Sequence, residues 1–268
     1  MKSCPICRSD KTGQLKPVNG FDVFKCRNCK LIWVPGVSSE TISNFYSREY
    51  FRSKDATLGY HDYLEDEEII RINARYILSN MPAPRNSDSR ILDVGCAYGF
   101  LLDEARKRGW SPHGVELNKE AVEYAAGRLK LNAINTTLEN APFPDGFFEN
   151  AVIIGSIEHF ADPFSVIDRV NRLMQKGGHL AITTINTQGP VRLYDIKPPE
   201  HLYYFSAHNL AMMLESHGFK VVKTLPYWCH YHLSEALCRA YRLVFRIDMR
   251  IEKFLESIPF LKTCMKVP

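Results

Sequence analysis

Four cysteines near the start of the chain have the spacing of a metal site. Cys4 and Cys7 form one C-x2-C pair, and after eighteen intervening residues Cys26 and Cys29 form a second. Two residues between thiolates let each pair turn tightly and direct both sulfurs at one ion, so the set predicts a tetrahedral Cys4 zinc site. A closed site of this kind is structural rather than catalytic. A part in holding a substrate or partner stays open, and four free thiols at coincidental spacing are the alternative.

A second group of residues has the order of a nucleotide-type cofactor site. A short apolar run ends around Asp93, a loop with Gly95, Ala97 and Gly99 follows, and Glu116 comes twenty-one residues after Gly95. Glycines let the backbone approach a ligand closely, and the next helix presents free N–H groups. A carboxylate at Glu116 can accept both hydroxyls of a ribose. Asp93 suits a cationic ligand, whereas a dinucleotide-binding dehydrogenase usually has an apolar residue there. A nicotinamide enzyme and a core without cofactor are the alternatives.

His159 and His201 are the candidate catalytic side chains. Each follows an apolar run that predicts a strand, and in parallel sheets ligands bind where the strands end. A histidine at that edge can take a proton from a substrate, and we expect His159 and His201 to lie on the same side of the cofactor and line one acceptor pocket. The alternative for each is a histidine that only packs its loop. Four further side chains in the same loops are candidates for substrate contacts: Asn186, Arg192, Glu200 and Tyr203.

The elements that must position these side chains alternate in type. Short apolar runs predict strands over 90–94, 113–116, 150–154 and 179–184. Amphipathic stretches predict helices over 100–107 and 119–130, and from Pro163 to a stop at 177–178. This alternation predicts an α/β fold with a mainly parallel sheet and helices on both faces.

The length of 268 residues allows one large domain and an appendage. The ribbon's strands should lie over 21–25 and 31–34. The stretch that follows the ribbon is rich in aromatic residues and has helical spacing over 65–78, so we do not expect it to be a flexible linker. Three parts are expected: a zinc ribbon over 1–35, an aromatic and helical connector over 36–88, and a core over 89–268.

Composition and charge restrict the partners. Apolar residues make up 45% of the chain, no uncharged apolar run reaches 18 residues, and the N-terminus lacks the apolar stretch of a signal peptide. We therefore expect a cytoplasmic protein without a membrane span, whose eight cysteines are thiols or metal ligands rather than disulfides. A net charge of +4 does not by itself indicate nucleic-acid binding.

Near the C-terminus, an insertion over about 230–258 has two contrasting faces. Leu233, Leu237 and Val244 share an apolar helical face, and five basic residues fall opposite: Arg239, Arg242, Arg246, Arg250 and Lys253. A surface helix covering the active-site cleft is the main expectation. A homodimer or partner surface over 233–255, or a helix lying on anionic lipid, is the alternative.

The cofactor motif resembles class I S-adenosylmethionine-dependent methyltransferases. Leu92-Asp-Val-Gly-Cys-Ala-Tyr-Gly99 resembles the family's first motif, and Gly114-Val-Glu116-Leu117 resembles its second. The segment 198–206 resembles a subgroup that carries an N-terminal Cys4 zinc ribbon. The resemblance implies a Rossmann-like sheet of seven strands, in which 219–225 and 261–266 form a terminal antiparallel pair.

The resemblance also implies S-adenosylmethionine as cofactor and assigns residues to it. Glu116 would hold the ribose, Leu117 would flank the adenine, and Leu138 would offer a backbone N–H where Thr137 replaces a common acidic residue. Five more residues would contact the cofactor: Asp93, Gly95, Ala97, Gly99 and Gly155. Some relatives carry a Glu-x-x-Glu-His magnesium site, of which this chain keeps only Glu158 and His159.

The implied activity is methylation of a small-molecule acceptor, with oxygen as the preferred target. Methylation of nitrogen or carbon on a sugar-like or lipid-linked substrate is the alternative among enzymes. The alternative from another class is an RNA-binding or protein-binding module on a degenerate methyltransferase core. The intact residues Asp93, Gly95, Gly99 and Glu116 argue against degeneration.

Overall fold

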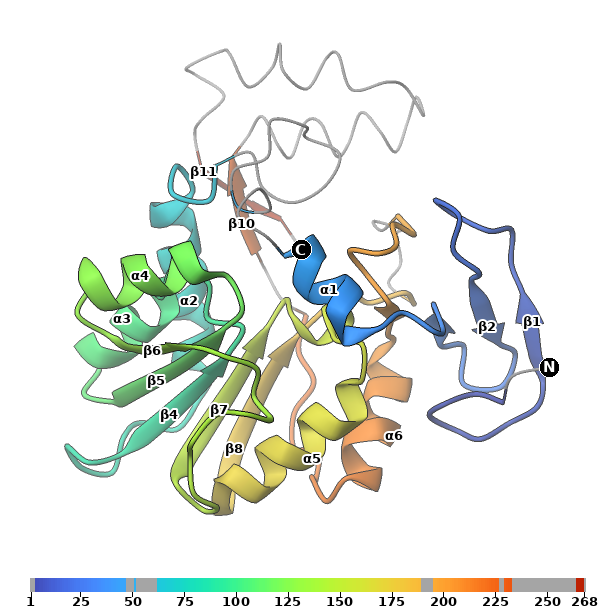
Figure 1. Ribbon diagram of the computed structural model, residues 1–268. Helices are drawn as coiled ribbons and strands as arrows, with labels where there is room; N and C mark the ends of the chain where they lie inside the picture. The colour runs from blue at the N-terminus through green and yellow to red at the C-terminus, as the bar shows by residue number, and fades with distance from the viewer. Residues whose placement is uncertain are drawn as a thin grey trace.

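The computed structural model describes residues 3–46, 51, 62–188, 195–226, 229–232 and 264–267. Figure 1 shows a central sheet with helices packed on it and the N-terminal ribbon at one side. No helix among these residues combines the length and the apolar character that a membrane crossing needs. Arg192 and nearly all of the expected insertion over 230–258 lie outside the described residues.

Five strands form the core sheet, in the order β6-β5-β4-β7-β8, and all neighbouring pairs are parallel. Their bounds are Arg90–Val94 (β4), Ser111–Glu116 (β5), Asn132–Asn135 (β6), Phe148–Ile154 (β7) and Met174–Thr183 (β8). The chain runs outward from β4 to β6 and then returns to β7 on the other side of β4. The strand order therefore reverses between β4 and β7, and sheets of this type bind ligands at the carboxyl ends of the strands at such a point.

Helices cover both faces of the sheet, as expected. Alternate residues of β4 face opposite layers: Leu92 packs with Val166 and Ile167, whereas Ile91 packs with Leu101 and with α2. The helices are α2 (Glu67–Ser79), α3 (Phe100–Lys107), α4 (Lys119–Gly127), α5 (Pro163–Leu173) and α6 (Ala207–Ser216). The predicted α/β fold with a parallel sheet is therefore confirmed for the described residues.

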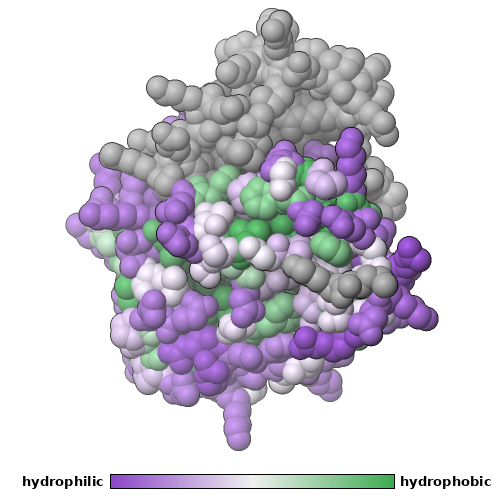
Figure 2. Space-filling model, turned by 45° about the vertical axis from the view of Figure 1, so that its right-hand side comes forward, coloured by the Kyte–Doolittle hydropathy of each residue, from purple (hydrophilic) through white to green (hydrophobic). Residues whose placement is uncertain are grey.

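The surface reflects this layering. In Figure 2, hydrophilic side chains dominate the lower half of the molecule, where Figure 1 has α5 and α6, and apolar ones gather higher up. Helix α5 buries Val166, Ile167 and Val170 against the sheet. A helix of this kind presents its polar side to water.

The end of α5 differs from the sequence-based expectation. The helix ends at Leu173, and β8 begins at Met174, so the pair Gly177-Gly178 lies within the strand. The register with β7 shifts between Phe148 and Asn150, and a Cβ on Gly178 would lie 2.2 Å from the backbone oxygen of Glu149. The glycines thus permit an irregular strand pairing here rather than ending a helix.

The expected sheet of seven strands is not what the described residues form. The run 219–225 forms no strand, and β10 (Cys229–His232) pairs with β11 (Cys264–Val267) as a separate antiparallel sheet. Phe219 packs against the core, but Val222 is 74% exposed and Leu225 is 46% exposed, so most of this run is not held against β8 by burial. Strand β6, in contrast, was not anticipated.

The ribbon joins the core through a strand. Its strands β1 (Thr12–Gln14), β2 (Phe24–Cys26) and β3 (Ile32–Trp33) are antiparallel, and β9 (Tyr203–Tyr204) from the core pairs with β3. Val23, Leu31 and Trp33 belong to the same apolar cluster as Phe205. Helix α1 (Ser39–Phe45) follows the ribbon. The division into three parts at residues 35 and 88 stays a prediction.

Candidate active site

The loop after β4 is left-handed at three positions: φ is +80° at Gly95, +45° at Ala97 and +82° at Gly99. Glycine adopts this region without a steric cost, so the rarer φ of Ala97 explains why the resembling motif favours glycine there. A Cβ on Gly99 would lie 2.9 Å from the Leu131 side chain. The loop therefore bends tightly over the carboxyl end of β4 into α3.

Glu116 ends β5 directly beneath this loop. Its Oε2 accepts a hydrogen bond from the Ala97 N–H at 3.0 Å, and its Oε1 accepts one from the Asn118 N–H at 2.9 Å. Burial raises the pKa of Glu116 despite these bonds. A carboxylate can accept about four hydrogen bonds, so the side chain is oriented but retains acceptor capacity for ribose hydroxyls.

Asp93 places a second carboxyl group near Glu116. Its side chain is only 3% exposed, and burial, followed by the charge of Glu116, raises its pKa to about 8. Besides these two acids, His159 acts on the pair by lowering the pKa of Glu116. Two buried acids without a lysine or arginine partner in the described residues fit a cationic ligand, such as a sulfonium or an ammonium.

Three further predicted cofactor residues surround the same sheet edge. Leu117 lines a pocket of about 440 Å³ together with α1 and the start of α4. Leu138 is buried in the core that also contains Phe143. Gly155 directly follows β7 with a φ of +57°, and a Cβ added to it would meet no atom within 4 Å. The residues assigned to the cofactor thus follow strands of one sheet at its carboxyl edge, and of these Leu117 lines the pocket.

The structure brings His159 and His201 together, with ring centroids 4.7 Å apart. His159 lies in a short 3-10 turn, Ile157–His159, which Ser156 ties to β4 through a bond from its Oγ to the Val94 oxygen. The Nδ1 of His159 lies 2.5 Å from the Glu200 backbone oxygen. Since a carbonyl only accepts, Nδ1 must carry the proton when the ring is neutral, and Nε2 offers a lone pair.

His201 has a different environment. It is 6% exposed, and its buried Nδ1 has no hydrogen-bond partner. Burial, followed by the charges of His159 and Lys197, lowers the pKa of His201 to about 2. The imidazole therefore stays neutral at physiological pH. A neutral ring of this kind suits a hydrogen-bond acceptor or a metal ligand better than a general base.

Glu158 completes a cluster with the two histidines. Its Oε2 accepts a hydrogen bond from Thr184 Oγ1 at 2.9 Å. Glu158, His159 and His201 each offer one ligand atom, and these atoms lie within 4.8 Å of one another. Nitrogen and oxygen donors in this number can hold a divalent cation.

Sequence reasoning missed Tyr46, which α1 brings to this cluster. Its hydroxyl donates to the Glu200 oxygen at 3.4 Å, its ring meets His159 edge-on at 5.5 Å, and it lines the pocket beside Leu117. The many aromatic residues of the connector over 36–88 were the sequence signal that could have pointed to Tyr46. Tyr203, by contrast, packs against Phe164 in the core.

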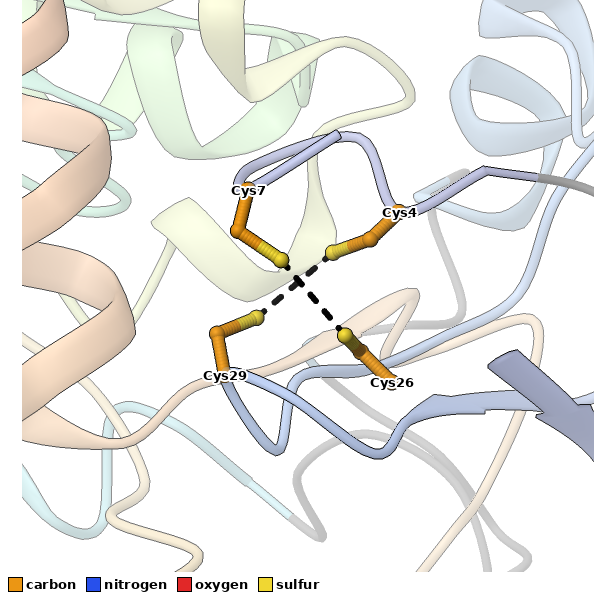
Figure 3. Close-up of side chains that lie close together, drawn as sticks. All are labelled: Cys4, Cys7, Cys26 and Cys29. Atoms are coloured by element: carbon orange, nitrogen blue, oxygen red, sulfur yellow. Dashed lines mark hydrogen bonds between the residues drawn. The ribbon is translucent and has the colours of Figure 1, made fainter. Parts of the chain in front are cut away.

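The four ribbon cysteines converge on one point, as Figure 3 shows. Cys4 and Cys29 have their Sγ atoms 3.5 Å apart, as do Cys7 and Cys26, and all four lie within 4.8 Å of one another. Sulfurs around a tetrahedral zinc with bonds of about 2.3 Å stand roughly 3.8 Å apart, so the arrangement fits that ion. Burial raises the pKa of Cys4 to about 11, and a metal would favour its thiolate.

Comparison with known proteins places these features in a family. Residues 65–224 match the family model described as a methyltransferase domain. The ubiquinone biosynthesis O-methyltransferase of Vibrio parahaemolyticus is 32% identical over 119 residues, which cover 42% of this chain and 51% of that protein. The chain thus spans about half the length of the curated relatives it matches.

Solved structures agree on the fold. Geranyl diphosphate C-methyltransferase from Streptomyces coelicolor has a TM-score of 0.55 at 18% identity, covering 81% of this chain and 91% of that one. A SAM-dependent methyltransferase from Archaeoglobus fulgidus has a TM-score of 0.50 at 22% identity, covering 60% and 75%. At such identities the likeness concerns the fold alone.

Proposed function

The chain belongs to the methyltransferase domain family, and on that premise we propose that it transfers a methyl group from S-adenosylmethionine to an oxygen of a small-molecule acceptor. The observation that carries the proposal is the pair of buried acids, Asp93 and Glu116, beneath a left-handed loop. Curated relatives named O-methyltransferases support oxygen as the target.

His159 is the proposed general base. The cofactor, when bound, supplies an activated methyl group. The Glu200 oxygen holds Nδ1 of His159, so Nε2 is left to accept the proton of an acceptor hydroxyl as its oxygen attacks the methyl. Tyr46 packs edge-on against the ring and restricts its orientation. Positioning of the two reactants supplies the rest of the rate.

A second arrangement serves the same activity. Glu158, His159 and His201 would hold a divalent cation that binds the acceptor oxygen and lowers its pKa. The imidazole of His201 is neutral and its buried Nδ1 has no hydrogen-bond partner, which favours this arrangement. Adding magnesium or manganese to dialysed enzyme separates the two: transfer that depends on the cation supports the metal, and transfer that does not depend on it leaves His159 as the base.

The test of the cofactor claim is calorimetry on Glu116→Ala. We expect affinity for S-adenosylmethionine and S-adenosylhomocysteine to fall about 10-fold to 150-fold, because roughly 1.5–3 kcal/mol of hydrogen bonding to a charged group is lost. Glu149→Ala is the matched control, since that carboxylate lies on β7 and bonds Ser89 instead. Unchanged affinity in Glu116→Ala would mean that the ribose binds elsewhere.

Cofactor binding should also release a proton near neutral pH. With a pKa of about 8, Asp93 is largely protonated at pH 7 in the free protein, and a cationic ligand favours its carboxylate. Binding heats at pH 7 should therefore differ between phosphate and Tris buffers, and Asp93→Asn should remove the difference. Equal heats in both buffers for the unaltered protein would contradict this.

The same group makes the free protein's stability depend on pH. The folded-state pKa of Asp93 is raised from 3.8, so its contribution to stability is fully present below about pH 4. That contribution is lost as the pH rises through about 8.

The acceptor itself is identified by assay. Transfer from labelled S-adenosylmethionine to a panel of phenols, amines and sugar nucleotides distinguishes oxygen from nitrogen or carbon as the target. A chain that binds the cofactor but methylates nothing in the panel, and retains RNA on a filter, would favour the alternative of a binding module.

A further inference from the structure

Strand β9 lies between the ribbon and the acceptor side of the site. We infer that the ribbon is a positioning element of that site. Its edge strand β3 holds the segment that carries His201, and so does the hydrogen bond from Asn209 in α6 to Cys29 in the ribbon. The role given to His201 rests on the proposed function, but the structural link does not.

The first link is a strand pairing followed by two backbone hydrogen bonds. In the antiparallel register, Ile32 stands opposite Tyr204 and Trp33 stands opposite Tyr203. Immediately beyond the pair, the Val34 N–H donates to the Leu202 oxygen at 2.9 Å, and the Leu202 N–H donates to the Glu158 oxygen at 2.8 Å. Leu202 therefore connects the ribbon with the turn that carries Glu158 and His159.

The second link passes through Tyr204, which is fully buried in β9. Its hydroxyl donates to the His201 oxygen at 3.1 Å and accepts a hydrogen bond from the Lys197 N–H at 2.8 Å. These bonds close the loop 197–204 on itself. Because β3 sets the place of Tyr204, it also sets the backbone of His201.

The third link reaches the metal site. Asn209 is 0% exposed, and its Nδ2 donates to the backbone oxygen of Cys29 at 3.1 Å. Its Oδ1 accepts a hydrogen bond from the Ser206 N–H at the start of α6. One side chain thus joins a predicted zinc ligand to the helix that follows β9. Asn19 adds a contact from the ribbon to the Pro198 oxygen at 2.9 Å.

These links matter because both β9 and the ribbon are too small to be stable on their own. Strand β9 has two residues, and within the described residues its partner in the sheet is β3. A strand this short has no stability of its own and depends on its neighbour. The ribbon depends in turn on its metal site. Disturbing the ribbon should therefore move His201 and leave the cofactor loop between β4 and α3 in place.

The test uses the full chain with Asn209→Asp. This change keeps an oxygen for the Ser206 N–H and removes the N–H group that reaches Cys29. Asn171→Asp is the control for the same change of side chain, because Asn171 donates to the His217 oxygen at the surface of α5 and not to the ribbon. Four quantities are measured: zinc content, affinity for S-adenosylhomocysteine, amide exchange over 202–204, and the ring nitrogen resonances of His201.

We expect Asn209→Asp to speed amide exchange over 202–204 by about 10-fold to 100-fold and to shift the His201 ring resonances, with zinc and cofactor affinity unchanged. Asn171→Asp should change none of these. If Asn209→Asp fails to fold, the same measurements on the unaltered chain after zinc removal replace it. Unchanged exchange and resonances in the variant, or after zinc removal, would overturn the inference. Absent cofactor binding in the unaltered chain would instead overturn the proposed function.

Discussion

Replacing His159 by alanine should lower the rate of methyl transfer about 10²-fold to 10⁴-fold and leave affinity for S-adenosylmethionine nearly unchanged. The expectation follows from the bond between Nδ1 of His159 and the Glu200 oxygen, which leaves Nε2 to accept the acceptor's proton. Single-turnover transfer from labelled cofactor measures the rate, and calorimetry measures affinity. His217→Ala is the control, because that ring bonds the Met213 oxygen in α6.

The two histidines should respond differently to pH. With a pKa of about 2, His201 does not titrate between pH 5 and 9, so His201→Ala should retain the pH dependence of the unaltered enzyme even where the rate falls. A His159→Ala enzyme with normal turnover and lower thermal stability would show that His159 only packs its loop. Positioning alone would then account for catalysis, as it can for an acceptor that is already ionised.

Cys26→Ser should abolish the tight binding of one zinc per chain. Structural zinc sites of this type contribute about 10–16 kcal/mol of apparent binding free energy, which a ribbon this small needs in order to fold. Metal analysis of purified protein should give one zinc per unaltered chain and a large loss in the variant. Cys229→Ser is the control, since that thiol lies in β10 and accepts a hydrogen bond from Asn73.

The same variant should still bind S-adenosylhomocysteine, because the residues assigned to the cofactor lie in or just after the core strands β4, β5, β6 and β7. Purified protein without stoichiometric zinc would remove the prediction of a metal site. Loss of cofactor affinity together with zinc would show that the ribbon supports the whole core rather than the acceptor side alone.

Much of the fold was predictable because its signals are local. The cysteine pairs, the loop from Gly95 to Gly99 and the apolar runs at 90–94 and 150–154 each specify a turn or strand through neighbouring residues. Strand β6 escaped because Asn132–Asn135 begins and ends in asparagine and lacks a clear apolar run. The run 219–225 has the residue types of a strand, but Val222 and Leu225 are exposed and it forms none.

The sequence by itself determined which residues can do chemistry: the cysteine spacing specifies a metal set, and the order of Asp93, the glycine loop and Glu116 specifies a cofactor site. Only the tertiary structure decided which side chains meet. The sequence predicted that His159 and His201 share one side of the site, but only the fold put their rings in contact, brought Tyr46 to them and paired β9 with the ribbon. The spacing of residues in the sequence determines contacts within one turn or at one strand end. Contacts between distant segments depend on which faces are buried against each other and on the register in which strands pair.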